Sequence, residues 1–305
     1  MAIGSIVPFV VSPYYATLII TMLAFSIALL GLNLLFGYGG LLSLGHAMYM
    51  AMGAYSVALL GSKLAIKSFE LQLLLAVVVS GTAAAVIGLM CVRYTTIFFS
   101  MLTLAFGMIF HSFLFKFYEL TGGETGISVA RPSLLGFAFA GMSKTTFLIG
   151  PFYWYVLALF VGMFAVMAVI VRSPYGLALQ AMRDNPRKTE FLGVAILKVR
   201  YVAFVISAIY CAVGGAIMAV SIGAADPDLA FWTQSGNLVF VLVLGGLGQM
   251  FGSIAGSVVF TLLQDALMAH TQYWRFALGA LLALIIIFSP QGIVGLLSQA
   301  FGRRR

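Results

Sequence analysis

Residues 201–222 read YVAFVISAIYCAVGGAIMAVSI, a run of apolar and small side chains without a charge. A helix that crosses the hydrocarbon core of a bilayer needs about 20 such residues, so this run predicts a membrane-spanning helix. The segment at 236–247 is apolar but short, and we expect it to be a re-entrant or broken helix. Continuous rather than alternating apolar runs argue against a β-barrel. The other predicted spans are residues 14–36, 40–61, 71–92, 95–116, 153–171, 251–270 and 274–297.

The composition of the whole chain indicates the same class of protein. Of the 305 residues, 63% are hydrophobic and only 8% are charged, whereas soluble domains have about 45–50% and about 25%. So few charges cannot cover a soluble globule, which excludes a soluble enzyme, a disordered chain and a secreted disulfide scaffold. Cys91 and Cys211 stand alone in apolar runs, as buried structural thiols do. We expect an all-α polytopic transmembrane helical bundle of about 8–10 spans, forming a single domain over residues 1–305.

The positions of Lys and Arg predict the orientation in the membrane. Residues 172–200 hold six of the 16 basic side chains, and residues 303–305 are three arginines. Loops rich in Lys and Arg stay in the cytoplasm, so we expect this loop and the C-terminus to be cytoplasmic. Residues 223–235, which contain acids and no base, residues 117–152 and the N-terminus are expected to be external. The N-terminus lacks a basic segment, so its first span is expected to be retained. This asymmetry explains the net charge of +8 without nucleic acid.

Small residues recur at helical spacing along the predicted spans. Between helices in lipid, small side chains allow the close backbone approach that drives association. Two glycine-rich stretches, at residues 37–45 and 245–252, are expected to break their helices. Backbone groups freed at membrane depth must lie against protein or a water-filled cavity, so these breaks either pack helices together or line a pathway. The small-residue series are Gly248, Gly252 and Gly256; Ser80, Ala84 and Gly88; and Gly45, Gly53 and Gly61.

Polar side chains at membrane depth are candidates for function. His46 lies at the first predicted break with Ser43 one turn away. Either His46 bonds a freed backbone carbonyl and holds the bend, or it faces a translocation pathway together with Ser43. Gly45, Gly246 and Gly248 complete the candidate pathway residues.

The predicted external side carries a few further polar residues. Asp226 and Asp228 are either solvated or in contact with basic residues of an external partner. His111, Asp265 and His270 lie near the external ends of their segments, and we expect them at the membrane interface.

The basic loop RSPYGLALQAMRDNPRKTEFLGVAILKVR, residues 172–200, is more elaborate than a turn. A helix is expected over about residues 175–182. An Asn cap at Asn185 followed by Pro186 at the first helical position predicts a second helix to about residue 192, with Gly193 as its terminator. The loop either only sets the topology or presents two short helices to a cytoplasmic partner.

Four stretches in order resemble one protein family over nearly the whole chain. They are GYGGLLSLGHAMYMAMGAY from residue 37, LTGGETGI from residue 120, RSPYGLALQAMRDNPRKTEFLGV from residue 172 and LGGLGQMFGSIAGS from residue 244. The chain resembles the permease subunits of bacterial ATP-binding-cassette (ABC) importers, and is most similar to the M-type permease of the branched-chain amino acid systems.

This resemblance implies a function that composition does not. The chain would form half of a translocation pathway with a homologous H-type permease in the bacterial inner membrane. Two cytoplasmic ATPase subunits, which hold the ATP and Mg, would drive it, and an extracytoplasmic binding protein would deliver substrate. If Asp226 and Asp228 are not simply solvated, they are the candidate contacts with that binding protein. The chain itself would be no enzyme and would carry no metal or cofactor. The resemblance and the loop together give the candidate ATPase-coupling residues Tyr175, Gly176, Arg183, Asp184, Asn185, Pro186, Arg187 and Gly193.

Two other function classes fit the residues less well. A stand-alone secondary transporter usually buries carboxylates or His near the midplane, whereas Asp265 lies near an expected membrane edge. An intramembrane enzyme needs a cluster of catalytic groups at one depth, and the three histidines lie on separate segments. The substrate stays open between branched-chain or related amino acids and urea, short amides or small carboxylates.

Overall fold

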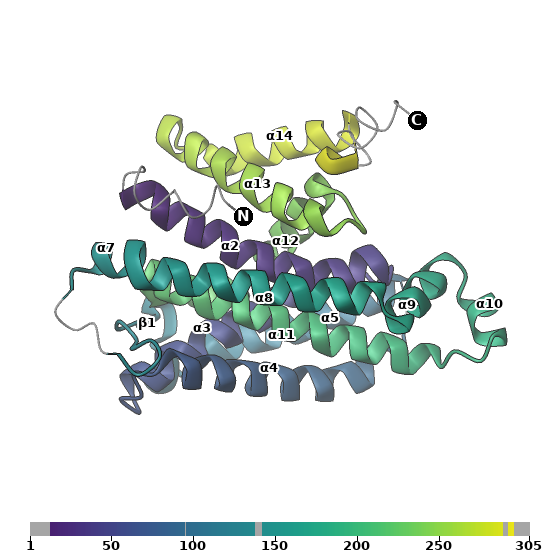
Figure 1. Cartoon of the computed structure of the whole chain (residues 1–305), viewed down its shortest axis with the longest axis horizontal. Helices are drawn as coiled ribbons and strands as arrows, with labels where there is room; N and C mark the ends of the chain where they lie inside the picture. The colour runs from purple at the N-terminus through teal and green to yellow at the C-terminus, as the bar shows by residue number, and fades with distance from the viewer. Residues whose placement is uncertain (1–12, 95, 138–141, 289–291, 296–305) are drawn as a thin grey trace.

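The computed structural model describes residues 13–94, 96–137, 142–288 and 292–295 (Figure 1). Within these residues, six helical segments are long and apolar enough to cross a membrane. Three more apolar helices are shorter: α3 (His46–Ser62), α12 (Trp232–Gly245) and α14 (Trp274–Phe288). Four of the six long segments are single helices: α4 (Phe69–Cys91), α5 (Thr96–Lys116), α11 (Ile196–Ile222) and α13 (Met250–His270). The other two are composite. Helix α2 (Pro13–Leu32) continues into the π-helical turn η1 (Asn33–Tyr38), and α8 (Tyr153–Arg172) follows α7 (Lys144–Phe147) and η3 (Leu148–Phe152).

This architecture confirms the predicted all-α polytopic bundle, although the bounds of several helices differ from those of the predicted spans. The predicted span at 40–61 begins only at His46, because residues 39–45 run without helical structure. The predicted span at 274–297 is helical from Trp274 to Phe288 and again over residues 292–295, and residues 289–291 lie outside the described residues. The rest of that prediction beyond residue 295, the N-terminal residues 1–12 and the arginines at 303–305 lie outside the described residues.

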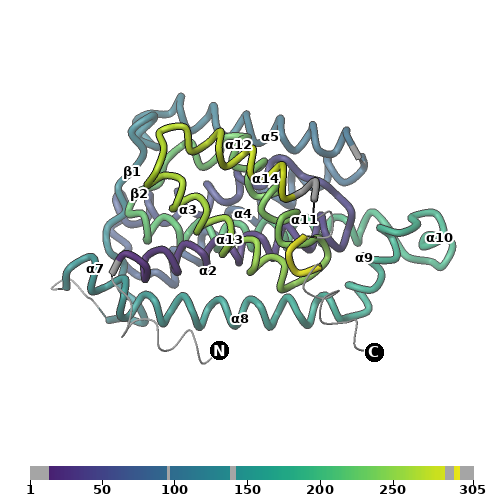
Figure 2. Tube along the Cα trace, turned by 90° about the horizontal axis from the view of Figure 1, so that it is seen from above, coloured from purple at the N-terminus to yellow at the C-terminus, as the bar shows by residue number. Residues whose placement is uncertain are grey.

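Helix α11 is the centre of the bundle. It packs against α2, α3 and α4, and together with α2 it is the most buried of the spans. Figure 2 shows α5 and α8 on opposite flanks. Their outer side chains, like those of α4, are apolar and exposed, as a lipid-facing surface requires: examples are Val86, Phe98 and Val169.

Glycines allow the closest contacts of α11, as their predicted packing role requires. A Cβ atom on Gly53 of α3 would lie 1.9 Å from the carbonyl oxygen of Ala212, and one on Gly215 would lie 1.9 Å from that of Met50. No real Cβ approaches an oxygen so closely, so α3 and α11 touch backbone to backbone. Ser80, Ala84 and Gly88 likewise lie on the buried face of α4.

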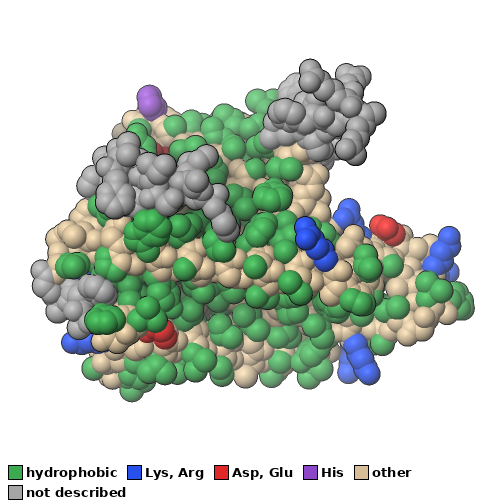
Figure 3. Space-filling model, viewed as in Figure 1, with side chains coloured by type: hydrophobic (Ala, Val, Ile, Leu, Met, Phe, Trp, Pro, Cys, Tyr) green, Lys and Arg blue, Asp and Glu red, His purple; other side chains and the backbone are tan. Residues whose placement is uncertain are grey.

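The polar parts of the chain gather at the two ends of the bundle. Figure 3 shows an apolar belt with Lys and Arg mainly at the end that carries α9 (Pro174–Asp184) and α10 (Pro186–Phe191). At the other end, the two loops that were predicted to share the external side are joined by an antiparallel pair of short strands. They are β1 (Ile127–Ser128), which follows α6 (Tyr118–Thr121) and η2 (Gly123–Thr125), and β2 (Ala224–Ala225), which precedes η4 (Pro227–Ala230).

Candidate functional site: a junction of the basic loop with two helix breaks

The two short helices of the basic loop begin at capping residues. Ser173 Oγ accepts a hydrogen bond from the Gly176 amide at 3.3 Å and opens α9. Asn185 Oδ1 accepts one from the Lys188 amide at 3.0 Å, with Pro186 at the first position of α10. Each cap satisfies an amide that the helix leaves without a partner. The predicted cap and the two helices are confirmed, with α9 extending over Pro174–Asp184, one residue earlier and two residues later than expected.

Helix α9 is packed against the membrane bundle. Leu179 is fully buried, and the hydroxyl of Tyr175 donates to the Val199 carbonyl at the start of α11 at 3.0 Å. Burial of this phenol raises its pKa. Gly176 faces the end of α8 so closely that a Cβ there would lie 2.2 Å from the Val171 oxygen. Helix α9 is therefore in direct contact with the end of α8 and the start of α11.

Helix α10, by contrast, projects from the end of the bundle, as Figures 1 and 2 both show. Its last residue, Phe191, is 91% exposed, and the next, Leu192, is 82% exposed. Asp184 and Arg187 are exposed as well. Gly193 follows with a φ of +86°, the left-handed conformation that a helix terminator requires. Two large apolar side chains in water at the tip of a basic loop are typical of a contact surface for another protein.

The first glycine-rich break follows η1. Gly40 has a φ of +71°, and the chain then runs in irregular conformation until α3 begins at His46. Gly37 lies against the second break: a Cβ on it would lie 2.6 Å from the Gly248 nitrogen. The predicted opening of the helix is confirmed over residues 39–45, whereas Gly37 and Tyr38 still belong to η1.

The second break separates α12 from α13 at residues 246–249. Gly246 and Gly248 have φ values of +119° and +73°, which side chains with a Cβ rarely adopt. Asn33 of η1 holds this break: its Oδ1 accepts from the Gly248 amide at 3.0 Å, and its Nδ2 donates to the Gln249 carbonyl at 2.9 Å. Nδ2 also lies 3.2 Å from Ser253 Oγ. One fully buried amide thus satisfies backbone groups that the break frees.

Arg183 of α9 reaches the place where the two breaks meet. Its Nη1 donates to the Gly37 carbonyl, and a Cβ on Gly248 would lie 3.3 Å from the same nitrogen. We call Asn33, Gly37, Arg183 and Gly248 the glycine junction. It joins the basic loop to both helix breaks, and the spacing of these residues along the chain does not indicate it.

Sequence reasoning missed Asn33 as a site residue. The signal was available, because Asn33 is an amide inside an otherwise apolar predicted span. A polar side chain at such a position finds a partner or is costly to bury.

His46 and Ser43 form a separate, buried cluster. His46 Nδ1 lies 2.7 Å from Ser43 Oγ, and Nε2 lies 2.6 Å from Ser207 Oγ on α11. The expectation that His46 bonds a backbone carbonyl is therefore wrong, because each of its ring nitrogens lies within hydrogen-bond distance of a serine hydroxyl. Both Ser43 and His46 are 0% exposed, and Gly45 packs on α5, where a Cβ would lie 2.2 Å from the Thr103 oxygen. Their assignment to a translocation pathway stays a prediction.

The two external aspartates have different roles in the fold. Asp226 caps η4, accepting from the Asp228 amide at 2.9 Å, whereas Asp228 lines a cavity between η4 and the helices around it. Their contact with a binding protein stays a prediction. Among the described residues, no group of three or more His, Cys, Asp or Glu side chains is placed to hold a metal ion.

Apolar spans, two broken helices and a capped loop that touches both breaks define a polytopic helical membrane protein. The family described as "Branched-chain amino acid transport system / permease component" matches residues 14–288, and the chain belongs to this family. It is 29% identical over 304 residues to the high-affinity branched-chain amino acid transport system permease protein LivM of Salmonella typhimurium, covering 94% of this chain and 71% of that protein. LivM of Escherichia coli is 28% identical over the same shares.

Similarity to a second type of permease is shorter. LivH of Salmonella typhimurium is 29% identical over 191 residues, covering 60% of each chain. No solved structure matches the chain. The chain is therefore a multi-pass membrane permease component, more similar along its length to LivM than to LivH.

Proposed function

We propose that this chain is the M-type permease subunit of an ABC importer for branched-chain or related amino acids. It forms half of the translocation pathway, and a homologous H-type permease forms the other half. The observation that carries this proposal is the family match over residues 14–288 together with the LivM similarity over 94% of the chain. The weaker similarity to LivH supports a partner permease of related sequence.

In this proposal, the end with α9 and α10 faces the cytoplasm of a bacterial cell, and the chain lies in its inner membrane. The concentration of Lys and Arg at this end supports the orientation (Figure 3). An extracytoplasmic binding protein delivers the substrate at the opposite end, where β1 and β2 join the loops.

Two cytoplasmic ATPase subunits dock on the permeases and drive transport. The exposed side chains of Phe191 and Leu192 on this chain supply an apolar contact for one of them. Movement of α10 passes to α9, and the Arg183 contact with Gly37 passes it on to both helix breaks. The breaks then switch between two packings of rigid helices, which is how small displacements become large rearrangements.

Uptake by cells tests the proposal directly. A strain that lacks the gene is complemented with it, and uptake of labelled leucine, isoleucine and valine is compared with uptake of urea, a short amide and a small carboxylate. We expect restored uptake of the amino acids only. Restored uptake of another solute alone would assign that substrate, and unchanged amino acid uptake in the deletion strain would refute the proposal.

A further inference from the structure

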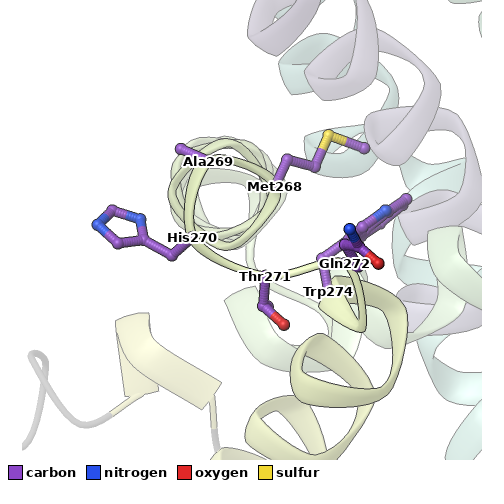
Figure 4. Close-up of a pocket in the computed structure, with 6 residues that line it drawn as sticks. All are labelled: Met268, Ala269, His270, Thr271, Gln272 and Trp274. Carbon is purple, nitrogen blue, oxygen red and sulfur yellow. The ribbon is translucent and has the colours of Figure 1, made fainter.

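A cavity of about 820 Å³ lies between α2, α12, α13 and α14. Ile222, the last residue of α11 before β2, and Asp228 of η4 also line it, so the cavity reaches the end of the bundle that carries β1 and β2, which we call the outer end. A smaller hollow at the turn between α13 and α14 shares Met268 and Trp274 with the cavity wall. In Figure 4 these two side chains lie toward the rest of the molecule, whereas His270 points away from it.

Uncharged polar side chains line the cavity in stripes. On α12 and on α13 they recur three or four positions apart, so each helix turns one polar face to the cavity. The exposed side chains on the flanks of the bundle, such as Val86, Phe98 and Val169, are apolar instead. Polar groups at membrane depth are costly in lipid and are tolerated beside water-filled cavities, so the stripes indicate a cavity that holds water. Their members, with one residue of α2, are Thr21, Thr233, Gln234, Asn237, Thr261 and Gln264.

Charged side chains mark the mouth of the cavity. Asp228 belongs to η4, Asp265 to the last two turns of α13 and Arg275 to the first turn of α14. Tyr14, at the start of α2, donates to Asp265, which brings the outer end of α2 to the same place. Charged groups keep contact with water, so the outer end is the side from which water enters.

Two stacked rings close the inner end of the cavity. Phe25 of α2 and Phe260 of α13, which we call the aromatic pair, have ring centroids 6.0 Å apart and are only 8% and 3% exposed. Within the described residues, no part of α2 after Phe25 and no part of α13 before Phe260 lines the cavity.

Helices α2 and α13 run antiparallel, so their contacts form a series in depth. Tyr14 bonds Asp265 near the outer end, and Asn33 Nδ2 lies 3.2 Å from Ser253 Oγ at the glycine junction. The aromatic pair lies between these two contacts. Ser253 is 0% exposed, so the bundle is open to water on the outer side of the aromatic pair and closed on its inner side.

The packing of α12 on α13 shows the same change with depth. A Cβ on Gly256 would lie 2.3 Å from the Val241 oxygen, and one on Gly252 would lie 2.5 Å from the Gly246 oxygen. The two helices therefore touch backbone to backbone beside the second break, whereas their outer parts carry the polar stripes and border the cavity.

We propose that this cavity is the outer vestibule of the translocation pathway, and that the aromatic pair closes its inner end in this conformation. The polar stripes of α12 and α13 form this chain's wall of the vestibule, and a solute moves inward only when the aromatic pair separates. This places the pathway beside α12 and α13 rather than at Ser43 and His46, which are 0% exposed. The inference rests on the proposed function, which puts the outer end outside the cell.

Three cysteine variants of one helix, α13, test the vestibule. The native Cys91 and Cys211 are buried, so a charged, membrane-impermeant thiol reagent reports on the introduced residue. Gln264→Cys lies in the cavity wall, and Leu262→Cys replaces a side chain that is 47% exposed but lies outside that wall. Ser253→Cys lies on the inner side of the aromatic pair.

The whole importer is treated without ATP in membrane vesicles whose external face is outward. We expect Gln264→Cys to react at least about tenfold faster than either control, because the reactive thiolate forms only where water and reagent reach it. Asn237→Cys, on the stripe of α12, should behave like Gln264→Cys and repeats the measurement on a second helix.

Three results would overturn the inference. A rate at Gln264→Cys equal to that at Leu262→Cys would show a cavity filled with lipid. A rate equal to that at Ser253→Cys would show that nothing closes the inner end. Faster reaction of Gln264→Cys in inverted vesicles would place the mouth on the cytoplasmic side.

Uptake tests whether the vestibule belongs to the pathway. In vesicles loaded with ATP and supplied with the binding protein, modification of Gln264→Cys should lower isoleucine uptake about tenfold, because the adduct fills part of a cavity of small-molecule size. Modification of Glu124→Cys, an exposed residue of the external loop between α6 and β1, should leave uptake unchanged. Full uptake by fully modified Gln264→Cys would overturn the inference. Absence of isoleucine uptake by the unmodified importer would instead refute the proposed function, so the two failures are distinguishable.

A double variant tests the closure itself. Phe260→Ala combined with Ser253→Cys should raise the reaction rate from the external side about tenfold, since the reagent then reaches the thiol. Phe251→Ala in the same Ser253→Cys background is the matched control, because Phe251 also belongs to α13 but is 66% exposed and lies outside the cavity wall. Equal rates in the two double variants would show that the aromatic pair does not close the vestibule.

Discussion

Helices α9 and α10 are neighbours in one basic loop, yet they differ in what they contact. Helix α9 buries Leu179, bonds α11 through Tyr175 and reaches the glycine junction through Arg183. Helix α10 exposes Phe191 and Leu192 and has few contacts with the bundle. We propose that this difference separates two tasks: α9 transmits a displacement, and α10 presents a surface to the subunit that causes it.

The largest effect is expected from charge reversal at the glycine junction. Arg183→Glu replaces a donor to the Gly37 carbonyl with a carboxylate that repels it, so isoleucine uptake should fall about tenfold or more, equivalent to at least about 1.4 kcal/mol. Co-purification of the ATPase subunits should persist, because α10 is unchanged. Arg187→Glu on α10 should instead weaken co-purification of the ATPase subunits. If Arg183→Glu cells transport normally, α9 does not transmit through this contact.

Two glycines of the loop test the packing difference itself. Gly176→Ala places a Cβ against the Val171 carbonyl, so α9 must shift, at a cost of about 1–3 kcal/mol. Gly193→Ala meets no atom within 4 Å and suffers only the strain of its positive φ, about 1 kcal/mol. Thermal unfolding of the purified complex and isoleucine uptake should both be affected more by the first variant. Equal effects would contradict the tight packing of α9.

Removal of the Asn33 side chain should destabilise the protein by about 1–3 kcal/mol, since Asn33→Ala leaves the partly buried Gly248 amide without its partner. Ser26→Ala in α2, the helix that leads into η1, is the matched control, because within the described residues Ser26 Oγ bonds a carbonyl of its own helix, that of Met22, at 2.8 Å. The control should shift the unfolding midpoint little. Equal midpoints for the two variants would show that Asn33 does not hold the second break.

The smallest effect on stability is expected at the tip of α10. The double variant Phe191→Ser with Leu192→Ser removes side chains that are already in water, so the free energy of unfolding should change by no more than about 0.5 kcal/mol. ATPase co-purification should nevertheless decline, because the apolar contact is lost. A stable variant that retains its ATPase subunits fully would place their docking site elsewhere.

Local signals in the sequence predicted a large part of this molecule. Apolar runs gave the spans, the Asn185–Pro186 pair gave the start of α10, and Gly193 gave its end, because each of these depends on a residue and its near neighbours. The helix breaks were equally local, since the glycines at 37–45 and 246–249 permit backbone conformations that other residues resist. The short strands β1 and β2 were not predicted, because two-residue pairings leave no periodic pattern.

Local sequence signals did not predict the hydrogen-bond partners of individual polar groups. One of the two alternatives for His46 was a bond to a backbone carbonyl, but Ser207, 161 residues away, takes its Nε2. Asn33 bonds residues more than 200 positions distant. Arg183 was selected for its loop, and its contact with Gly37 became visible only when α9 was seen packed beside η1.

The sequence by itself determined that this protein lies in a membrane, that its helical segments break at two glycine-rich stretches, and to which family it is similar. These properties follow from hydrophobicity summed over a window and from backbone preferences of single residues. Only the tertiary structure decided that one arginine, one asparagine and two glycines meet at a junction, and that charges of both signs line one cavity. Such contacts depend on how the helices pack in three dimensions. Many packing arrangements of the same spans are compatible with the same apolar pattern.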